Sequence, residues 1–378
     1  MDLPRARHEY LLREVELRGS VRSAQAAAHL GVSEVTVRRD IAALDRDGRL
    51  VRVHGGAIAA RSTRAPTAAR ALVGVVVPST TAHFPQMVRG MEALAPSLHA
   101  RLVLGVSHYR PEVEEAQTER LLALGVSGLV LAPTLRDRDE AQLGRWLATL
   151  AVPVVLVERR VEPPGARELD LARTDHAHGA VIAVEHLARL GHERVALAVY
   201  DRTPTAPWIR QGHAEAVARL GLAAAPDTSL PKGYDDPAEL AQALEALLDD
   251  CAATGTRAVL VHTDDHAARL VETALDRGMR VPEDLAVVAY DDENAELAAV
   301  PLTAVTPPRR EVGREALRLV LDRVGDVGQG EGVRASRHVE LLPRLTVRES
   351  CGAAPDGAAP DGVGLDGAGL AGSVARRP

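Results

Sequence analysis

Short stretches with helical spacing of apolar residues fill the first 60 positions. Residues 5–18 predict an amphipathic helix that Gly19 ends. Its apolar positions, set in a charged background, are Tyr10, Leu11, Leu12, Val15 and Leu17. Ser23 is placed to cap a second helix, AQAAAHL, which stops at Gly31.

A third helix follows in the stretch EVTVRRDIAALDRDG, with Ser33 as its expected cap and Gly48 at its end. Val37, Ile41 and Leu44 stand at spacings of four and three, so they form one apolar face. The two adjacent arginines that follow Val37 must therefore lie off that face.

The stretch after Gly48, RLVRVHGGAI, alternates apolar and polar residues and predicts a small β-hairpin. Three helices followed by a hairpin form the winged helix-turn-helix pattern, whose recognition helix enters the DNA major groove. We therefore interpret residues 1–60 as a DNA-binding domain, although the charge pattern alone equally fits an arginine-bearing helix that faces solvent. The expected DNA contacts are Ser33, Glu34, Thr36, Arg38, Arg39, Arg49, Arg52 and His54.

From Leu72 onward, short apolar runs alternate with helical stretches. The runs are LVGVVVP (72–78), RLVLGVS (101–107), GLVLAP (128–133), VPVVLVE (152–158), RVALAV (194–199), AVLVHTDD (258–265) and LAVVAYDD (285–292). Strands that are apolar on both faces and separated by helices predict parallel α/β sheets. Two sets of runs, on either side of about residue 170, predict two α/β lobes.

Two stretches lack such patterning. Residues 61–71, within a segment of small residues, proline and arginine, are expected to be a linker. Residues 351–378, rich in Gly, Ala, Pro and Asp with a tandem AAPDG repeat, are expected to be a disordered tail.

Composition places the 378-residue chain among ordinary globular proteins, with 46% apolar and 26% charged residues. Its net charge of −7 is unevenly spread, because residues 1–70 hold 13 arginines against 8 acidic residues. A basic head on an acidic body suggests that the head meets a polyanion.

The number of cysteines and the lack of secretory or membrane-spanning patterns indicate the cellular compartment of the protein. Two cysteines, Cys251 and Cys351, are too few for a disulfide framework or a zinc cluster, which favours a reducing cytoplasm. The first residues contain no apolar core of a secretory signal, and no long uncharged apolar run predicts a membrane span. We therefore expect a cytoplasmic protein with no membrane contact and no metal or other cofactor.

The stretch GVSEVTVRRDIAALDRDGRLVRVHGGA, from Gly31 to Ala57, resembles the DeoR-type winged helix. The matching motif runs VS-x-x-T-[IV]-RRDL, then L-x-x-x-G, then RVHGGA, with Ile41 where leucine is usual. The resemblance covers about residues 5–60 and implies that Ser33, Thr36, Arg38 and Arg39 belong to the recognition helix.

The body resembles the effector domain of the lac-repressor (LacI) family, which has the periplasmic sugar-binding fold. The residues that carry this resemblance are HLARLGHERVALAV (186–199), ALDRGMRVPEDLAVVAYDD (274–292), VPLTAV (300–305) and PRLTVRES (343–350). The resemblance covers residues 72–350 and implies two lobes with a ligand cleft between them. We expect lobe 1 over 72–168 and 296–325, and lobe 2 over 169–295 and 326–350, with crossings near 165–170 and 293–297.

Polar and aromatic residues follow several predicted strands, where parallel α/β sheets bind ligands. The candidate ligand contacts are Thr80, His83, Phe84, Ser107, Thr134, Arg159, Trp208, Arg210, Asp264 and Asp291. The resemblance makes Asp264 the strongest of these candidates. Asp291 and Glu158 are also suited to capping helices or pairing across the lobes, and Phe84 to filling the core.

One position departs from the family pattern. The family has an arginine three residues before a glycine, which holds sugar hydroxyls or a ligand carboxylate. The stretch PWIRQG instead has Ile209 at that position and Arg210 one place later. The identity of the ligand is therefore left open.

These patterns predict a dimeric transcriptional regulator, most simply a repressor, that binds a double-stranded operator and a small effector such as a sugar. Three alternatives remain: a binding protein with no DNA role, a DeoR-type regulator of a phosphorylated sugar or nucleoside, and an enzyme. The chain has no G-x-S-x-G elbow and no phosphate-binding G-x-x-x-x-G-K-[ST] loop, so we expect no catalysis. HTDDH at 262–266 and the pair His176 and His178 are interpreted as polar cleft or helix-start residues rather than as metal ligands.

Overall fold

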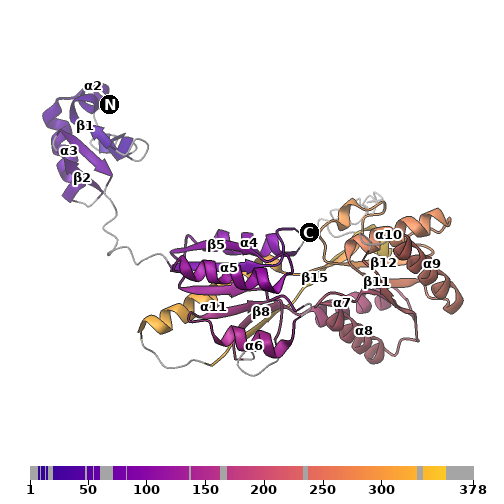
Figure 1. The fold of residues 1–378 in the computed structure, drawn as a ribbon. Coiled ribbons are helices and arrows are strands. Elements are labelled where there is room, and N and C mark those ends of the chain that lie inside the picture. Colours follow the sequence, from indigo (N-terminus) through magenta and orange to yellow (C-terminus); the bar gives the residue numbers. More distant parts are fainter. Residues whose placement is uncertain are drawn as a thin grey trace, which may run out of the picture. The chain divides into compact units, whose positions relative to one another are not determined.

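The computed structural model divides into two compact units, Met1–Arg70 and Ala71–Pro378 (Figure 1). It describes residues 7–8, 10–12, 14–15, 20–46, 49–53, 55–59, 71–81, 83–135, 138–161, 168–232, 237–329 and 335–354. Most of the expected linker and residues 355–378 of the expected tail lie outside these ranges.

The first unit is a winged helix-turn-helix fold, as the sequence predicted. Helical residues between 7 and 15 are followed by β1 (Ser20–Arg22), α2 (Ser23–Leu30), α3 (Glu34–Arg46), β2 (Leu50–Val53) and β3 (Gly56–Ala59). The three strands form an antiparallel sheet in the order β1-β3-β2. Strand β1 was not predicted, because three residues are too few to show an alternating pattern.

The helix boundaries of this unit follow local chemistry. Gly31 ends α2 in the left-handed region with φ of 66°, and the Ser33 hydroxyl accepts the Thr36 backbone N–H at 3.2 Å. The expected cap at Ser23 was wrong, because Ser23 is the buried first residue of α2. Its backbone N–H donates to the carbonyl of Gly55 at 2.9 Å, so the wing supplies a partner that a cap would otherwise provide.

The buried face of α3 contains Val37, Ile41 and Leu44, as predicted, together with Asp40. Arg7 Nε donates to the Asp40 carboxylate at 2.7 Å, and both side chains are buried. A buried ion pair of this kind holds α3 in place relative to the first helical residues, because separating buried opposite charges is costly.

The second unit contains two six-stranded sheets. The first is entirely parallel, in the order β14-β8-β7-β6-β4-β5. Its strands are β4 (Ala71–Val77), β5 (Ala100–Val106), β6 (Gly128–Leu131), β7 (Val154–Val157), β8 (Asp170–Thr174) and β14 (His338–Leu341). Its helices are α4 (His83–Leu94), α5 (Pro111–Ala123), α6 (Glu140–Ala148) and α11 (Arg309–Gln329). Figure 1 shows α11 beside these elements, although it lies far from them in the sequence.

The second sheet has the order β10-β9-β11-β12-β13-β15, parallel except for β15. Its strands are β9 (Ala196–Tyr200), β10 (Asp227–Leu230), β11 (Ala258–His262), β12 (Ala286–Tyr290), β13 (Thr303–Thr306) and β15 (Arg344–Thr346). The helices of this lobe are α7 (His176–Arg189), α8 (Ala206–Leu220), α9 (Pro237–Thr254) and α10 (Asp264–Asp276), with short 3-10 turns at Ala295–Leu297 and Glu349–Cys351. Strands β11 and β12 are buried at every residue, as expected of central parallel strands.

The chain changes lobes at three places, as the expected lobe ranges imply, but each change lies further along the chain than expected. It crosses between β8 and α7, between β13 and α11, and between β14 and β15. The expected boundaries were wrong because β8 completes the first sheet, β13 pairs with β12, and β14 pairs with β8. Pairing of strands decides these boundaries, and it cannot be inferred from apolar runs alone.

The expected start of the disordered tail was also wrong. Residues 349–351 form a 3-10 turn, and Cys351 is buried against the second lobe. The Cys351 sulfur lies 3.2 Å from His186 Nε2 and accepts the Thr303 hydroxyl at 3.1 Å. The chain is therefore anchored one turn further than its composition suggested.

Hydrogen bonds to the Asp264 carboxylate, here called the Asp264 brace, hold the loop that contains Asp291 at the carboxyl edge of the second sheet. The Asp264 carboxylate, at the start of α10, accepts the backbone N–H groups of Asp292, Glu293 and Asn294 at 2.5 to 3.1 Å. Burial and the neighbouring Asp291 carboxylate raise the pKa of Asp264 to about 6, against those three donors, which favour its charged form.

Close helix packing in the second lobe depends on a glycine. A Cβ added at Gly212 in α8 would lie 1.9 Å from the backbone oxygen of Ala177 in α7. We expect Gly212→Ala to lower the free energy of unfolding by about 1–3 kcal/mol, because the two backbones must separate. Gly325→Ala, in α11 with nothing within 4 Å of the added Cβ, should instead stabilise by about 0.5–1 kcal/mol. Chemical denaturation followed by circular dichroism compares them, and equal effects would contradict the packing argument.

The Asp264 brace predicts a pH dependence of stability. Because the pKa is higher in the folded protein than the ordinary 3.8, ionisation costs stability as the pH rises from about 4 through about 6. Asp264→Asn removes this titration. The stability of the wild type relative to this variant should therefore fall by roughly 1–3 kcal/mol between about pH 4 and pH 7 in urea titrations.

The exposed carboxylate of Asp276, at the other end of α10, provides the matched control. Asp276→Asn should show a smaller change over the same pH range. If the wild type instead becomes more stable relative to Asp264→Asn as the pH rises, the three backbone donors stabilise the Asp264 carboxylate by more than burial destabilises it.

Candidate functional site

One face of α3 is left uncovered within the first unit. Ser33, Arg38 and Arg39 are exposed, and Val35 keeps 67% of its surface accessible. Arg38 forms an ion pair with Glu34 at 2.7 Å. Arg39 has no such partner among the described residues, so its guanidinium is available to a polyanion.

The start of this face is held in one conformation by side-chain bonds. The hydroxyls of Ser33 and Thr36 lie 2.9 Å apart, in addition to the capping bond described above. On the wing, Arg49 and Arg52 are exposed, and the Arg52 backbone N–H donates to Asp45 at 3.0 Å. The predicted contact His54 lies outside the described residues. The other predicted DNA contacts therefore lie on one end of α3 and on the adjoining strand.

A pocket of about 660 Å³ lies in the second unit between the two lobes. This volume suits a small-molecule ligand. The pocket is lined by His83, Phe84, Tyr109, Thr134, Leu135, Glu158, Arg159, His176, Tyr200, Asp201, Arg202, Thr203, Pro204, Thr205, Lys232, His262, Thr263 and Asp291. Many of them follow the carboxyl ends of strands β6, β7, β9, β11 and β12, where parallel sheets place their sites.

The structure brings together half of the predicted ligand contacts. Those that line the pocket are His83, Phe84, Thr134, Arg159 and Asp291. Those that do not line it are Thr80, Ser107, Trp208, Arg210 and Asp264. Thr80 is exposed, Ser107 is buried outside the pocket, and Asp264 braces the loop that carries Asp291.

The two remaining candidates are committed to other partners. Arg210 pairs with Asp201 at 2.9 Å and also with Asp227. Trp208 stacks under the guanidinium of Arg173, 4.3 Å from its ring centre. The pocket residues that sequence reasoning missed include Tyr109, Tyr200 and Lys232, which stand in loops or at strand ends without a motif.

A buried carboxylate, Glu158, forms the first-lobe floor of the pocket. It accepts His83 Nε2 at 3.0 Å, the Thr174 hydroxyl at 3.0 Å and the Thr174 backbone N–H at 3.1 Å, and lies 3.4 Å from His176. Burial alone would raise the pKa of Glu158, but electrostatic attraction by His83 and His176 and their hydrogen bonds hold it well below its usual range. The Glu158 carboxylate is thus satisfied by hydrogen bonds within the protein.

The Arg309 side chain connects the hydrogen-bond network of Glu158 and His83 to acidic residues of the second lobe. Its Nε donates to His83 Nδ1 at 2.9 Å, which assigns the ring proton of His83 to Nε2 and hence to the bond with Glu158. The same guanidinium pairs with Asp291 at 3.4 Å and with Glu293 at 3.5 Å. Arg309 begins α11, directly after a crossing between the lobes, so the pocket and the crossing share side chains.

Two buried polar atoms in the pocket wall lack hydrogen-bond partners among the described residues. They are Thr134 Oγ1 in the first lobe and His262 Nδ1 in the second. Burial lowers the pKa of His262 to about 4, with a partly opposing effect of Asp291, so this imidazole is neutral at neutral pH. Unpaired buried polar atoms are costly, which makes them expected contacts for a polar ligand.

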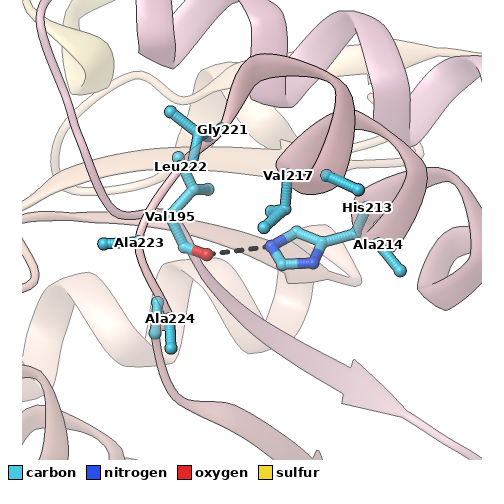
Figure 2. A pocket seen from close by; sticks show the side chains of 10 residues that line it. Val195, His213, Ala214, Val217, Gly221, Leu222, Ala223 and Ala224 are labelled. Atoms are coloured by element: carbon cyan, nitrogen blue, oxygen red, sulfur yellow. Dashed lines mark hydrogen bonds between the residues drawn. The ribbon is translucent and has the colours of Figure 1, made fainter.

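A second hollow of about 510 Å³ lies beside α8 and is chemically different (Figure 2). It is lined mainly by alanine and valine, and His213 Nε2 donates to the backbone oxygen of Val195 at 2.8 Å. Burial lowers the pKa of His213, so the ring is kept neutral. Without convergent polar groups, this hollow is a poorer candidate for a specific ligand.

The described residues contain no group of three or more His, Cys, Asp or Glu side chains placed to hold a metal ion. None of the helices within the described ranges has the length and apolar run needed to span a bilayer.

Comparison with known proteins identifies the two domains. Residues 7–63 match the model of the DeoR-like helix-turn-helix domain, and residues 184–351 match that of the periplasmic binding protein-like domain. The arabinose metabolism transcriptional repressor of Geobacillus stearothermophilus is 25% identical over 80% of this chain and 86% of its own length. The lactose operon repressor of Escherichia coli K12 is 28% identical over 75% of each chain.

A solved structure shares the fold. The transcriptional regulator CelR, in its cellobiose complex, superposes with a TM-score of 0.62 at 24% identity, over 86% of this chain and 98% of that chain. The named relatives are transcriptional regulators rather than enzymes. The chain therefore joins a DeoR-like helix-turn-helix domain to a periplasmic-binding-protein-like domain, and its relatives are transcriptional repressors of the LacI family.

Proposed function

We propose that this protein is a transcriptional repressor whose operator affinity is set by a small polar effector bound between the lobes of its second unit. The observation that carries the proposal is the presence, in one chain, of a winged helix-turn-helix unit with an exposed α3 face and a pocket with unpaired buried polar atoms. The first feature fits a duplex, and the second fits a metabolite.

The exposed face of α3 suits the major groove, which accepts one helix. Arg39, without an intramolecular partner in the described structure, is suited to a phosphate or a guanine. The exposed methyl groups of Val35 are suited to a thymine methyl, and Arg49 and Arg52 on the wing to neighbouring phosphates. We expect two copies of the chain to bind the two halves of an inverted repeat.

The pocket suits a sugar or a related polar metabolite. Phe84 and Tyr109 supply aromatic faces, while Thr134, Arg159 and His262 supply hydrogen-bonding groups on both lobes. The names of the arabinose and lactose operon repressors, and the cellobiose bound to CelR, support a sugar. A phosphorylated sugar and a nucleoside are the alternative effectors.

Effector binding is coupled to DNA binding by lobe closure in this proposal. A ligand that contacts both Thr134 and His262 binds the closed arrangement more tightly than the open one, so it shifts the population toward closure. Linkage then requires that DNA and effector change each other's affinity by the same factor.

Arg39→Ala tests the DNA-binding face. We expect operator affinity to fall about 10- to 100-fold, because one direct contact to phosphate or base is lost. The slope of log affinity against log salt concentration should also decrease by about 1. Fluorescence anisotropy with promoter fragments from the neighbourhood of the gene, at several salt concentrations, measures both effects.

Arg46→Ala, at the other end of α3, removes the same charge from the same helix and serves as the control. It should cost less than about threefold in operator affinity, because only long-range attraction is lost. If both variants weaken binding equally, α3 does not present its N-terminal half to DNA. If the wild type binds no promoter fragment at low salt, the protein is not a repressor.

A further inference from the structure

Arg159 is a buried cation with no carboxylate partner in the described part of the chain. It follows β7, lines the pocket, and has 6% of its surface accessible. Its one hydrogen bond is to the backbone oxygen of Pro133, and no carboxylate lies within ion-pair distance of it among the described residues. A guanidinium carries five N–H donors, so most of those of Arg159 are unused. Buried charges in proteins are usually paired, which makes this exception informative.

Two aromatic rings stabilise the charge of Arg159 without using its hydrogen-bond donors. Its guanidinium carbon lies 5.7 Å from the ring centre of Phe84 and 5.6 Å from that of Tyr109. Aromatic faces attract a cation, but they leave the in-plane N–H donors of the guanidinium free. The neighbouring Thr134 hydroxyl, fully buried and unpartnered, adds a further donor next to Pro133.

The three acids that line the pocket are already engaged. Glu158 is held by His83 and Thr174, Asp291 by Arg309, and Asp201 by Arg210. The side chains of Arg202 and Lys232 also line the pocket from the second lobe. Glu158 and the buried Glu114 act on Arg159 electrostatically, but among the described residues neither lies within ion-pair distance of its guanidinium.

We propose that the effector carries an acidic group, a carboxylate or a phosphate, which pairs with the guanidinium of Arg159 and accepts the hydroxyl of Thr134. Such a group matches the planar fork of an arginine with two parallel hydrogen bonds. The inference rests on the proposed function, since it concerns the effector of the same pocket. It narrows the effector from neutral polyols to sugar acids or sugar phosphates.

Matched sugars test this assignment on the full-length protein. Isothermal titration calorimetry compares each neutral hexose of the gluco, galacto and manno series with its uronate and its 6-phosphate. In at least one series, we expect the uronate or the phosphate to bind at least about tenfold more tightly than the neutral sugar. The uronate and phosphate arms of each series distinguish the two sources of negative charge.

Variants of Arg159 and Thr134 test whether these two residues cause the preference for acidic over neutral sugars. Arg159→Gln should reduce the affinity for the acidic sugar about 10- to 100-fold and bring it close to that of the neutral sugar. Arg159→Lys should keep more of the preference, because it keeps the charge but loses the fork. Thr134→Val should weaken binding about three- to tenfold, whereas Ser107→Ala, which removes a buried unpartnered hydroxyl outside the pocket, should not. Circular dichroism checks that each variant is folded.

The proposal is overturned if neutral sugars bind as tightly as their acidic counterparts in every series, or if none of the acids binds at about 10 mM. It is also overturned if Arg159→Gln weakens neutral and acidic sugars by the same factor, since Arg159 would then serve hydroxyls or the fold. A neutral sugar that alters operator binding would sink this proposal and leave the repressor function intact.

Discussion

The contact between Arg309 and the acids of the second lobe is the interaction on which the pocket depends. Arg309 opens α11, which covers the first sheet, yet it pairs with Asp291 and Glu293 at the end of the second. Through His83 it also reaches Glu158 on the pocket floor. A change in the angle between the lobes must lengthen or shorten these bonds, because one guanidinium holds both sides. The shape of the pocket and the angle between the lobes therefore change together.

In the first unit, too, a buried charged contact fixes the position of a helix. Its core is built mainly from aliphatic side chains, such as Leu11, Ile41 and Leu44, which pack α3 against the rest of the unit. The buried pair of Arg7 and Asp40 adds a directional constraint to that packing. In the proposed function this direction matters, because a rotation of α3 about its axis would turn Val35 and Arg39 away from the duplex.

Apolar periodicity was enough to predict the winged helix, the two parallel α/β lobes and the buried face of α3, because those features are encoded locally. It could not predict which sheet β8, β13 and β14 join, since strand pairing depends on residues far apart in the sequence. The site was predicted in part for the same reason. His83, Thr134, Arg159 and Asp291 follow strands and line the pocket, whereas Asp264 and Arg210 find partners that no spacing reveals. Ligand contacts and loop braces use the same residue types at the same strand ends, so only the structure separates them.

In the proposed mechanism, the free energy needed to control DNA binding is small compared with what ligand contacts in the pocket can supply. Allosteric coupling of 1–3 kcal/mol is typical, and one hydrogen bond to a buried group contributes about 1 kcal/mol. Thr134 and His262 lie on opposite lobes, so a ligand satisfies both only when the lobes are close together. Two or three ligand hydrogen bonds that form only when the lobes are close together therefore supply about 1–3 kcal/mol of coupling. Because both atoms are buried without a hydrogen-bond partner among the described residues, a ligand that bonds to both would favour the arrangement in which the lobes hold them close together.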